Sequence, residues 1–164
     1  MSIKKKVQSN SGLEVKWALL CRSASIDQQT NSVSLFNVVE ELTINKAPLG
    51  NSIVKKLSNL PTKTQIKTDF TFVVHMERDP EVKIQKFNPG IKIKVVSPSG
   101  DTFAEAEVPL KFEAGKNRLR AIINMGTFPV KDSGLYKIVV STRVSLSDDF
   151  EEVEVVPVDV KIYE

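Results

Sequence analysis

Apolar and polar side chains alternate along most of the chain. In the clearest case, the segment 66–77, one side of an extended backbone carries Ile66, Phe70, Phe72, Val74 and Met76. A period of two indicates a β-strand with one buried face. The same period predicts strands over residues 13–22, 33–42, 102–112 and 153–162, and others beginning near Ile91, Leu119 and Tyr136.

The phase of the alternation predicts which side chains of each strand face the core. The segment 33–42 has apolar residues on both faces, which predicts a central strand. Pro109 cannot donate a ladder hydrogen bond, so the strand over 102–112 is expected at a sheet edge or a bulge. The first strand is expected to bury, on one face, Leu13, Val15, Trp17, Leu19 and Cys21.

The last predicted strand changes phase along its length. Val153 and Val155 occupy odd positions, whereas the later apolar residues Val158, Val160 and Ile162 occupy even ones. Pro157 stands at the change, and one extra residue there would keep both halves facing the core.

Eight short strands with turn signals between them and almost no helical period predict an all-β, two-sheet antiparallel β-sandwich. The 164 residues suit one domain, which we expect to span 13–164 after a disordered leader at 1–12. The segment 43–65 holds Pro48, Gly50 and Pro61 without alternation, which predicts one long irregular loop. A short helix is expected within it over 52–57.

One turn carries a more specific signal. The run Asp132-Ser133-Gly134-Leu135-Tyr136 leads into a predicted strand, with the tyrosine near the start of that strand. This pattern resembles the tyrosine corner of immunoglobulin-like sandwiches, in which the phenol packs inward and its hydroxyl bonds to nearby backbone. That resemblance implies an immunoglobulin-like fold, although Ile138 stands where antibody domains carry a cysteine.

The first two predicted strands carry a second resemblance. Leu19-Leu20-Cys21, followed by Ala24 and Asp27, and then the run Leu35-Phe36-Asn37-Val38-Val39-Glu40 resemble the opening of small, uncharacterised bacterial β-sandwich proteins. Phe128-Pro129 and the later Gly134-Leu135-Tyr136 are similar to that family's penultimate hairpin. The resemblance implies the fold and a bacterial source, and it brings no activity or functional residue.

Composition constrains the setting. The 23 basic residues are spread among 20 acidic ones, for a net charge of +3, which disfavours nucleic acid as a partner. The single cysteine, Cys21, excludes an intrachain disulfide and favours a reducing compartment. No apolar run approaches the roughly 20 residues of a membrane span. We expect a cytoplasmic protein without a transmembrane segment.

Catalytic and cofactor-binding patterns are absent from the sequence. The single histidine, His75, is predicted to face outward mid-strand, and Cys21 is interpreted as a small core residue. One histidine and one cysteine cannot form a Cys/His zinc set, and no glycine-rich phosphate loop occurs. We therefore predict that the protein is not an enzyme and has no catalytic residue, metal or cofactor.

Loop charges suggest two further hypotheses. Alternate loops would bring to one end of the sandwich the acids Asp27, Asp79, Glu81, Glu113, Asp148 and Asp149. Calcium takes six to eight oxygen ligands, so this end is a candidate calcium site, while solubilising charge is the simpler interpretation. The other end would carry a basic group made of Lys46, Lys55, Lys56, Lys63, Lys67 and Lys131.

These observations favour a non-enzymatic binding module that contacts another protein through a sheet edge or the 43–65 loop. One alternative is a calcium- or anion-dependent sandwich that docks on membranes, as C2-type domains do. Another is an enzyme that uses carboxylates in a pocket that a single sequence does not reveal. The sequence leaves the oligomeric state open.

Overall fold

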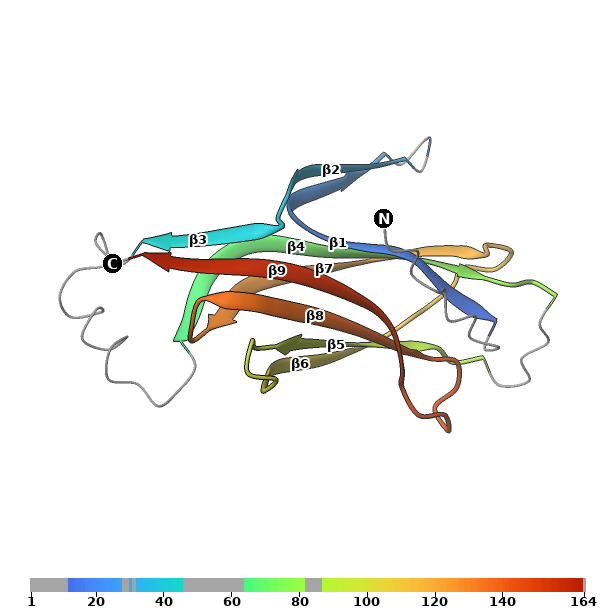
Figure 1. Ribbon diagram of the computed structural model, residues 1–164. Helices are drawn as coiled ribbons and strands as arrows, with labels where there is room; N and C mark the ends of the chain where they lie inside the picture. The colour runs from blue at the N-terminus through green and yellow to red at the C-terminus, as the bar shows by residue number, and fades with distance from the viewer. Residues whose placement is uncertain (1–11, 28–29, 31, 46–63, 82–86, 164) are drawn as a thin grey trace, which may run out of the picture.

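The computed structural model describes residues 12–27, 30, 32–45, 64–81 and 87–163, and these form strands and loops with no helix (Figure 1). The strands are β1 (Leu13–Ile26), β2 (Val33–Val38), β3 (Glu41–Asn45), β4 (Thr64–Arg78), β5 (Gly90–Val96), β6 (Thr102–Pro109), β7 (Arg118–Val130), β8 (Gly134–Arg143) and β9 (Glu151–Tyr163). The predicted all-β class is confirmed. Nine strands replace the expected eight because the segment 33–42 forms two.

The strands build two facing sheets. The four-stranded sheet has the order β2-β1-β4-β7, and the five-stranded sheet has the order β3-β9-β8-β5-β6. Every pair is antiparallel except β3–β9, which is parallel and departs from the expected antiparallel sandwich. As predicted from Pro109, β6 is an edge strand and ends at that residue.

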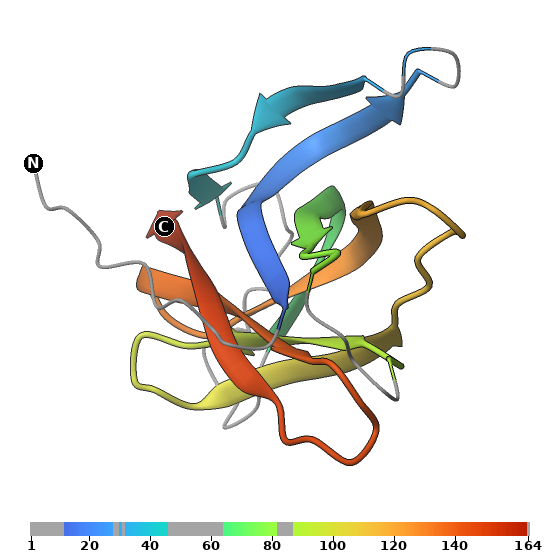
Figure 2. The same ribbon diagram turned by 90° about the vertical axis from the view of Figure 1, so that its right-hand side faces the viewer.

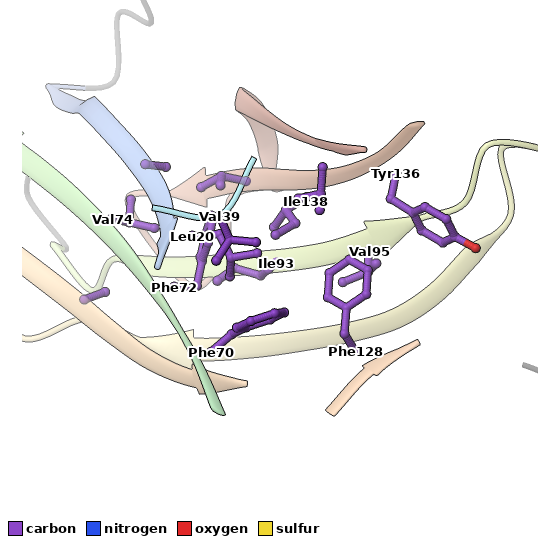
Figure 3. Close-up of a cluster of buried hydrophobic side chains, with 14 of the residues drawn as sticks. Leu20, Val39, Phe70, Phe72, Val74, Ile93, Val95, Phe128, Tyr136 and Ile138 are labelled. Carbon is purple, nitrogen blue, oxygen red and sulfur yellow. The ribbon is translucent and has the colours of Figure 1, made fainter. Parts of the chain in front are cut away.

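The core lies between the two sheets and is built from aliphatic and aromatic side chains. Figure 3 shows its centre, where residues of β4 such as Phe70 and Phe72 meet Ile93, Val95 and Ile138 of the opposite sheet. The predicted inward set of β4 is confirmed: Phe70, Phe72, Val74 and Met76 are buried in this core, and Ile66 packs at its margin.

A bulge in β1 reverses the predicted phase of that strand. Val15 pairs with Met76, but the next pair joins Trp17 to His75, so Lys16 is an extra residue. Beyond the bulge the inward residues are therefore the even-numbered Ala18 and Leu20. The expectation that Trp17 and Leu19 face the core was wrong, because a single inserted residue moves every later side chain to the other face.

The last strand contains the extra residue that the sequence predicted, but at another position. The pairing with β8 shifts between Glu152 and Glu154, so Val153 is the bulged residue. Pro157 instead lies in regular pairing opposite Lys137. The residues of β9 that pack on the core are Val153, Val156, Val158, Val160 and Ile162, without Val155.

The chain changes sheets between β2 and β3. Asn37 has a φ of 53°, a left-handed conformation that asparagine tolerates better than most residues. The Val39 amide then donates to the Leu20 carbonyl of β1 at 2.8 Å, and the Asp159 amide of β9 donates to the Glu40 carbonyl at 2.9 Å. Two consecutive residues thus join the two sheets. The apolar residues on both faces of 33–42 reflect this crossover, and the prediction of a central strand was wrong.

The tyrosine corner is present as predicted. Tyr136 is buried, with its ring 5.9 Å from that of Phe128 and 6.2 Å from that of Phe103. Its hydroxyl accepts hydrogen bonds from the amides of Lys131 (2.9 Å) and Asp132 (3.3 Å) and donates to the Asp132 carbonyl (3.1 Å). The turn between β7 and β8 is therefore fixed to the core by one side chain.

The predicted loop over 43–65 is shorter than expected at both ends. Residues 43–45 belong to β3, and residues 64–65 belong to β4. The intervening residues, with the predicted helix at 52–57 and Lys46, Lys55, Lys56 and Lys63, lie outside the described residues, as does the leader up to residue 11. Gly12 is described, and its carbonyl accepts from the Asp79 amide at 2.8 Å.

Tyr136→Phe should lower the free energy of unfolding by about 1–3 kcal/mol, because two partly buried amides lose their acceptor. Urea denaturation at constant pH measures this loss. Tyr163→Phe is the matched control, since Tyr163 is 54% exposed and should change stability little. Equal stability of the two variants would contradict the role of the corner.

Asn37→Val should destabilise the crossover by about 1–2 kcal/mol, because a β-branched side chain is sterically strained in a left-handed backbone conformation. Asn37→Gly, which adopts that conformation freely, should change stability by less than about 1 kcal/mol. Thermal unfolding of the pair separates backbone strain from loss of the amide side chain, and similar losses in both variants would argue against the strain.

Candidate functional site

The outer face of the four-stranded sheet holds the single histidine. His75 stacks on Trp17 with ring centroids 5.3 Å apart, and its Nε2 lies 3.7 Å from a carboxylate oxygen of Glu77. Its Nδ1 is buried without a hydrogen-bond partner among the described residues. Burial, helped by the charge of Arg120, lowers the pKa of His75. The outward orientation matches the sequence prediction, and the burial does not.

The single cysteine is buried on the same face. Its Sγ donates to the Thr71 carbonyl at 3.3 Å, and burial raises the pKa of the Cys21 thiol. A thiol with a raised pKa is a weak nucleophile, because the thiolate is the reactive form. Cys21 therefore acts here as a small packing residue.

Three of the loop carboxylates predicted as a calcium site have a local role. Asp27 accepts from the amide and hydroxyl of Thr30 at 2.7 and 2.9 Å, and Asp79 accepts from the Glu81 amide at 2.9 Å. Glu113 forms an ion pair with Lys116. Within the described ranges, no three Asp, Glu, His or Cys side chains come close enough together to hold a metal ion.

Asp148 and Asp149 line a separate hollow on the outer face of the five-stranded sheet. There two cations contact the ring of Phe150: the Lys92 ammonium lies 4.6 Å from the ring centre, and the Arg143 guanidinium lies 4.5 Å from it. Lys92 also pairs with Glu107 at 2.9 Å. This cluster fixes the end of the loop between β8 and β9 to the sheet.

The β1–β2 hairpin extends beyond the rest of its sheet. Residues of β1 beyond Cys21 pair with β2 and with no other described strand, because pairing with β4 ends at that residue. The hairpin projects past the other strands, on the side opposite β5 and β6 (Figures 1 and 2). β2 is the edge of its sheet, so its outer backbone groups have no strand partner in the described part of the chain.

The sequence of β2 lacks the features that usually discourage edge pairing. Val33–Val38 contains no charged residue and no proline. Two large apolar side chains on one of its faces are exposed, Phe36 at 52% and Val38 at 46%. Natural edge strands are normally protected by charges, prolines or short length. β2 is therefore the described edge best suited to accept another strand.

The other edges carry such protection. β6 has Glu105, Glu107 and its terminal Pro109, and β3 is only five residues long and begins with Glu41. The third edge, β7, carries Arg118, Arg120 and Pro129. The contrast singles out β2. The sequence reasoning missed it, because the segment 33–42 was assigned to a central strand, although its first six residues already lack charge.

The strand pairings define the class of the protein. β1, β4 and β7 correspond to strands A, B and E of an immunoglobulin sandwich, and β9, β8, β5 and β6 correspond to G, F, C and C′. Tyr136 stands at the start of the F-equivalent strand, where the tyrosine corner belongs. The chain is an immunoglobulin-like β-sandwich.

Comparisons with known proteins add little to this assignment. No protein-family model and no curated protein matches the chain. Among solved structures, an immunoglobulin-like protein from Pseudomonas aeruginosa is similar, with 12% sequence identity, coverage of 94% of this chain and 99% of that one, and a TM-score of 0.38. The fold class therefore rests on the strand pairings. The described residues include no helix long and apolar enough to cross a membrane.

The free energy of unfolding should fall as the pH drops through the ordinary pKa of histidine, near 6.5. The pKa of His75 is lower in the folded state, so below that pH the unfolded chain binds a proton that the native state does not. Urea denaturation between about pH 7.5 and about pH 5.5 should show this slope. His75→Gln should remove it, whereas an unchanged slope would show that other groups cause it.

Proposed function

We propose that this protein is a non-enzymatic interaction module that binds an extended segment of another protein along β2. The guest segment would add to the four-stranded sheet as a further strand. Main-chain hydrogen bonds supply affinity in this mode of recognition, and alternate side chains supply specificity. Phe36 and Val38 would contact the guest's apolar side chains on one face.

The observation that carries this proposal is the combination of an unprotected edge and a projecting hairpin. The edge of β2 is uncharged and free of proline, and the hairpin holds it away from the rest of the sandwich. Among the described residues, no other strand pairs with this part of the hairpin, so its edge is open to a partner. Exposed edges of this kind are templates for pairing with another chain.

The state of the titratable groups supports a binding role rather than catalysis. His75 is stacked on Trp17 with a lowered pKa, and the thiol of Cys21 is buried with a raised one. Asp27 and Asp79 accept hydrogen bonds within their own turns, and Glu113 pairs with Lys116. A single buried cysteine also fits our proposal of a cytoplasmic, reducing setting.

The expected affinity is modest. β2 has six residues, and a guest strand on it would bury less than the roughly 800 Å² per partner of a standard protein interface. Complexes of that size are commonly transient. We therefore expect dissociation constants on the order of micromolar for short peptides.

Selection of random peptides displayed on phage against the immobilised protein tests the proposal. Selected peptides should bind wild type, and Phe36→Lys should weaken them roughly tenfold, because half-buried apolar contact is lost and a charge is added. Leu135→Lys is the matched control: Leu135 is 50% exposed on β8, and its replacement should leave affinity within about twofold.

Backbone methylation of the selected peptides provides a second test, of the main-chain hydrogen bonds to β2. N-methylation of alternate residues removes donors to β2 on one edge only, so one of the two methylated registers should lose binding. Failure to select any peptide, or equal binding by both methylated registers, would contradict strand addition. The proposal would also be contradicted if the wild-type protein were a dimer and the Phe36→Lys variant a monomer. That result would show that a second copy of this chain occupies the edge of β2.

A further inference from the structure

Two adjoining hollows lie at the end of the sandwich where the loop between β6 and β7 meets the end of β4. The larger has a volume of about 420 Å³ and includes Arg78, Phe87 and Phe112 in its lining. The smaller, of about 180 Å³, includes Arg118 and Arg120. Three residues line both hollows: Lys111, Glu113 and Lys116.

Positive charge is concentrated in these hollows. Their lining contains the basic residues Arg78, Lys111, Lys116, Arg118 and Arg120. Glu113 is the one acidic residue among the lining, so the net charge of the two hollows is +4, whereas the whole chain carries +3. Glu77, which pairs with Arg118 at 2.8 Å, offsets one charge of the smaller hollow. The larger hollow keeps its net positive charge and would therefore attract an anion.

Arg78 gives the larger hollow both a donor and a flat surface. Its guanidinium lies 4.4 Å from the ring centre of Phe87, and that ring lies 5.5 Å from the ring of Phe112. The Nε of Arg78 is buried and has no hydrogen-bond partner among the described residues. Buried donors are nearly always satisfied in folded proteins, so this one calls for an acceptor that the described residues do not supply.

Backbone contacts hold the lining in place. The Arg78 amide donates to the Asn117 carbonyl at 2.7 Å, which joins the end of β4 to the start of β7. The loop turns through Gly115, whose φ of 75° suits glycine, and the Lys116 amide donates to the Glu113 carbonyl at 3.0 Å. Arg78 and Lys116 therefore line the hollow from fixed backbone positions, and Lys111 lines it beside them.

We propose that the larger hollow binds a small aromatic anion, a ring that carries a phosphate or carboxylate group. The anionic group would lie among Arg78, Lys111 and Lys116, and the ring would pack on Phe87 and Phe112. A volume of about 420 Å³ is within the range of small-molecule sites. This site is separate from β2 and does not depend on the proposed strand addition.

Isothermal titration calorimetry with phenyl phosphate, inorganic phosphate, benzoate and phenol tests the site. Phenyl phosphate should bind more tightly than inorganic phosphate, which lacks the ring, and phenol should not bind, since it lacks the charge. Benzoate reports whether a single negative charge suffices. Raising the salt concentration should weaken binding, because the attraction is electrostatic.

Substitutions locate the binding. Lys111→Gln should weaken phenyl phosphate roughly fivefold, whereas Lys137→Gln, the matched change at an exposed lysine of β8, should have no effect. Phe87→Ala should abolish the preference for phenyl phosphate over inorganic phosphate. No heat with phenyl phosphate, or equal weakening by both lysine substitutions, would overturn the proposal. Circular dichroism of each variant confirms that it is folded.

Discussion

The crossover at Val39 and Glu40 is the constraint on which the rest of the structure depends. The Val39 amide bonds to β1 and the Glu40 carbonyl bonds to β9, so the chain is fixed to both sheets within two residues. The side chain of Val39 also enters the core. Because the chain leaves the four-stranded sheet here, β2 stays at the edge of that sheet. β3 then forms the edge strand of the five-stranded sheet and pairs with β9 in parallel.

Both candidate surfaces are consequences of how the sandwich is closed. The hairpin edge exists because β1 is longer than the part that pairs with β4, so its last residues have only β2 as a partner. The basic hollows exist because the end of β4 and the start of β7 are joined beside the β6–β7 loop. One surface is uncharged and linear, and the other is charged and concave. They would therefore recognise different ligands, a polypeptide backbone and a small anion.

Local bulges explain most differences between expectation and structure. The alternation in β4 is continuous from Phe70 to Met76, and there the predicted inward residues are correct. In β1 the extra residue Lys16 reverses the phase, and in β9 the extra residue is Val153 rather than one at Pro157. Periodicity along one strand cannot locate a bulge, because the extra residue is defined by the pairing with a neighbour.

The sequence by itself determined the all-β class, the two-layer sandwich and the tyrosine corner, because hydrophobic period and turn residues act over short distances along the chain. Tertiary structure alone decided that 33–42 divides between two sheets, that β2 is an unprotected edge and that Arg78, Lys111 and Lys116 surround one hollow. These features join residues far apart in the chain, and only the pairing and packing of whole strands bring such residues together.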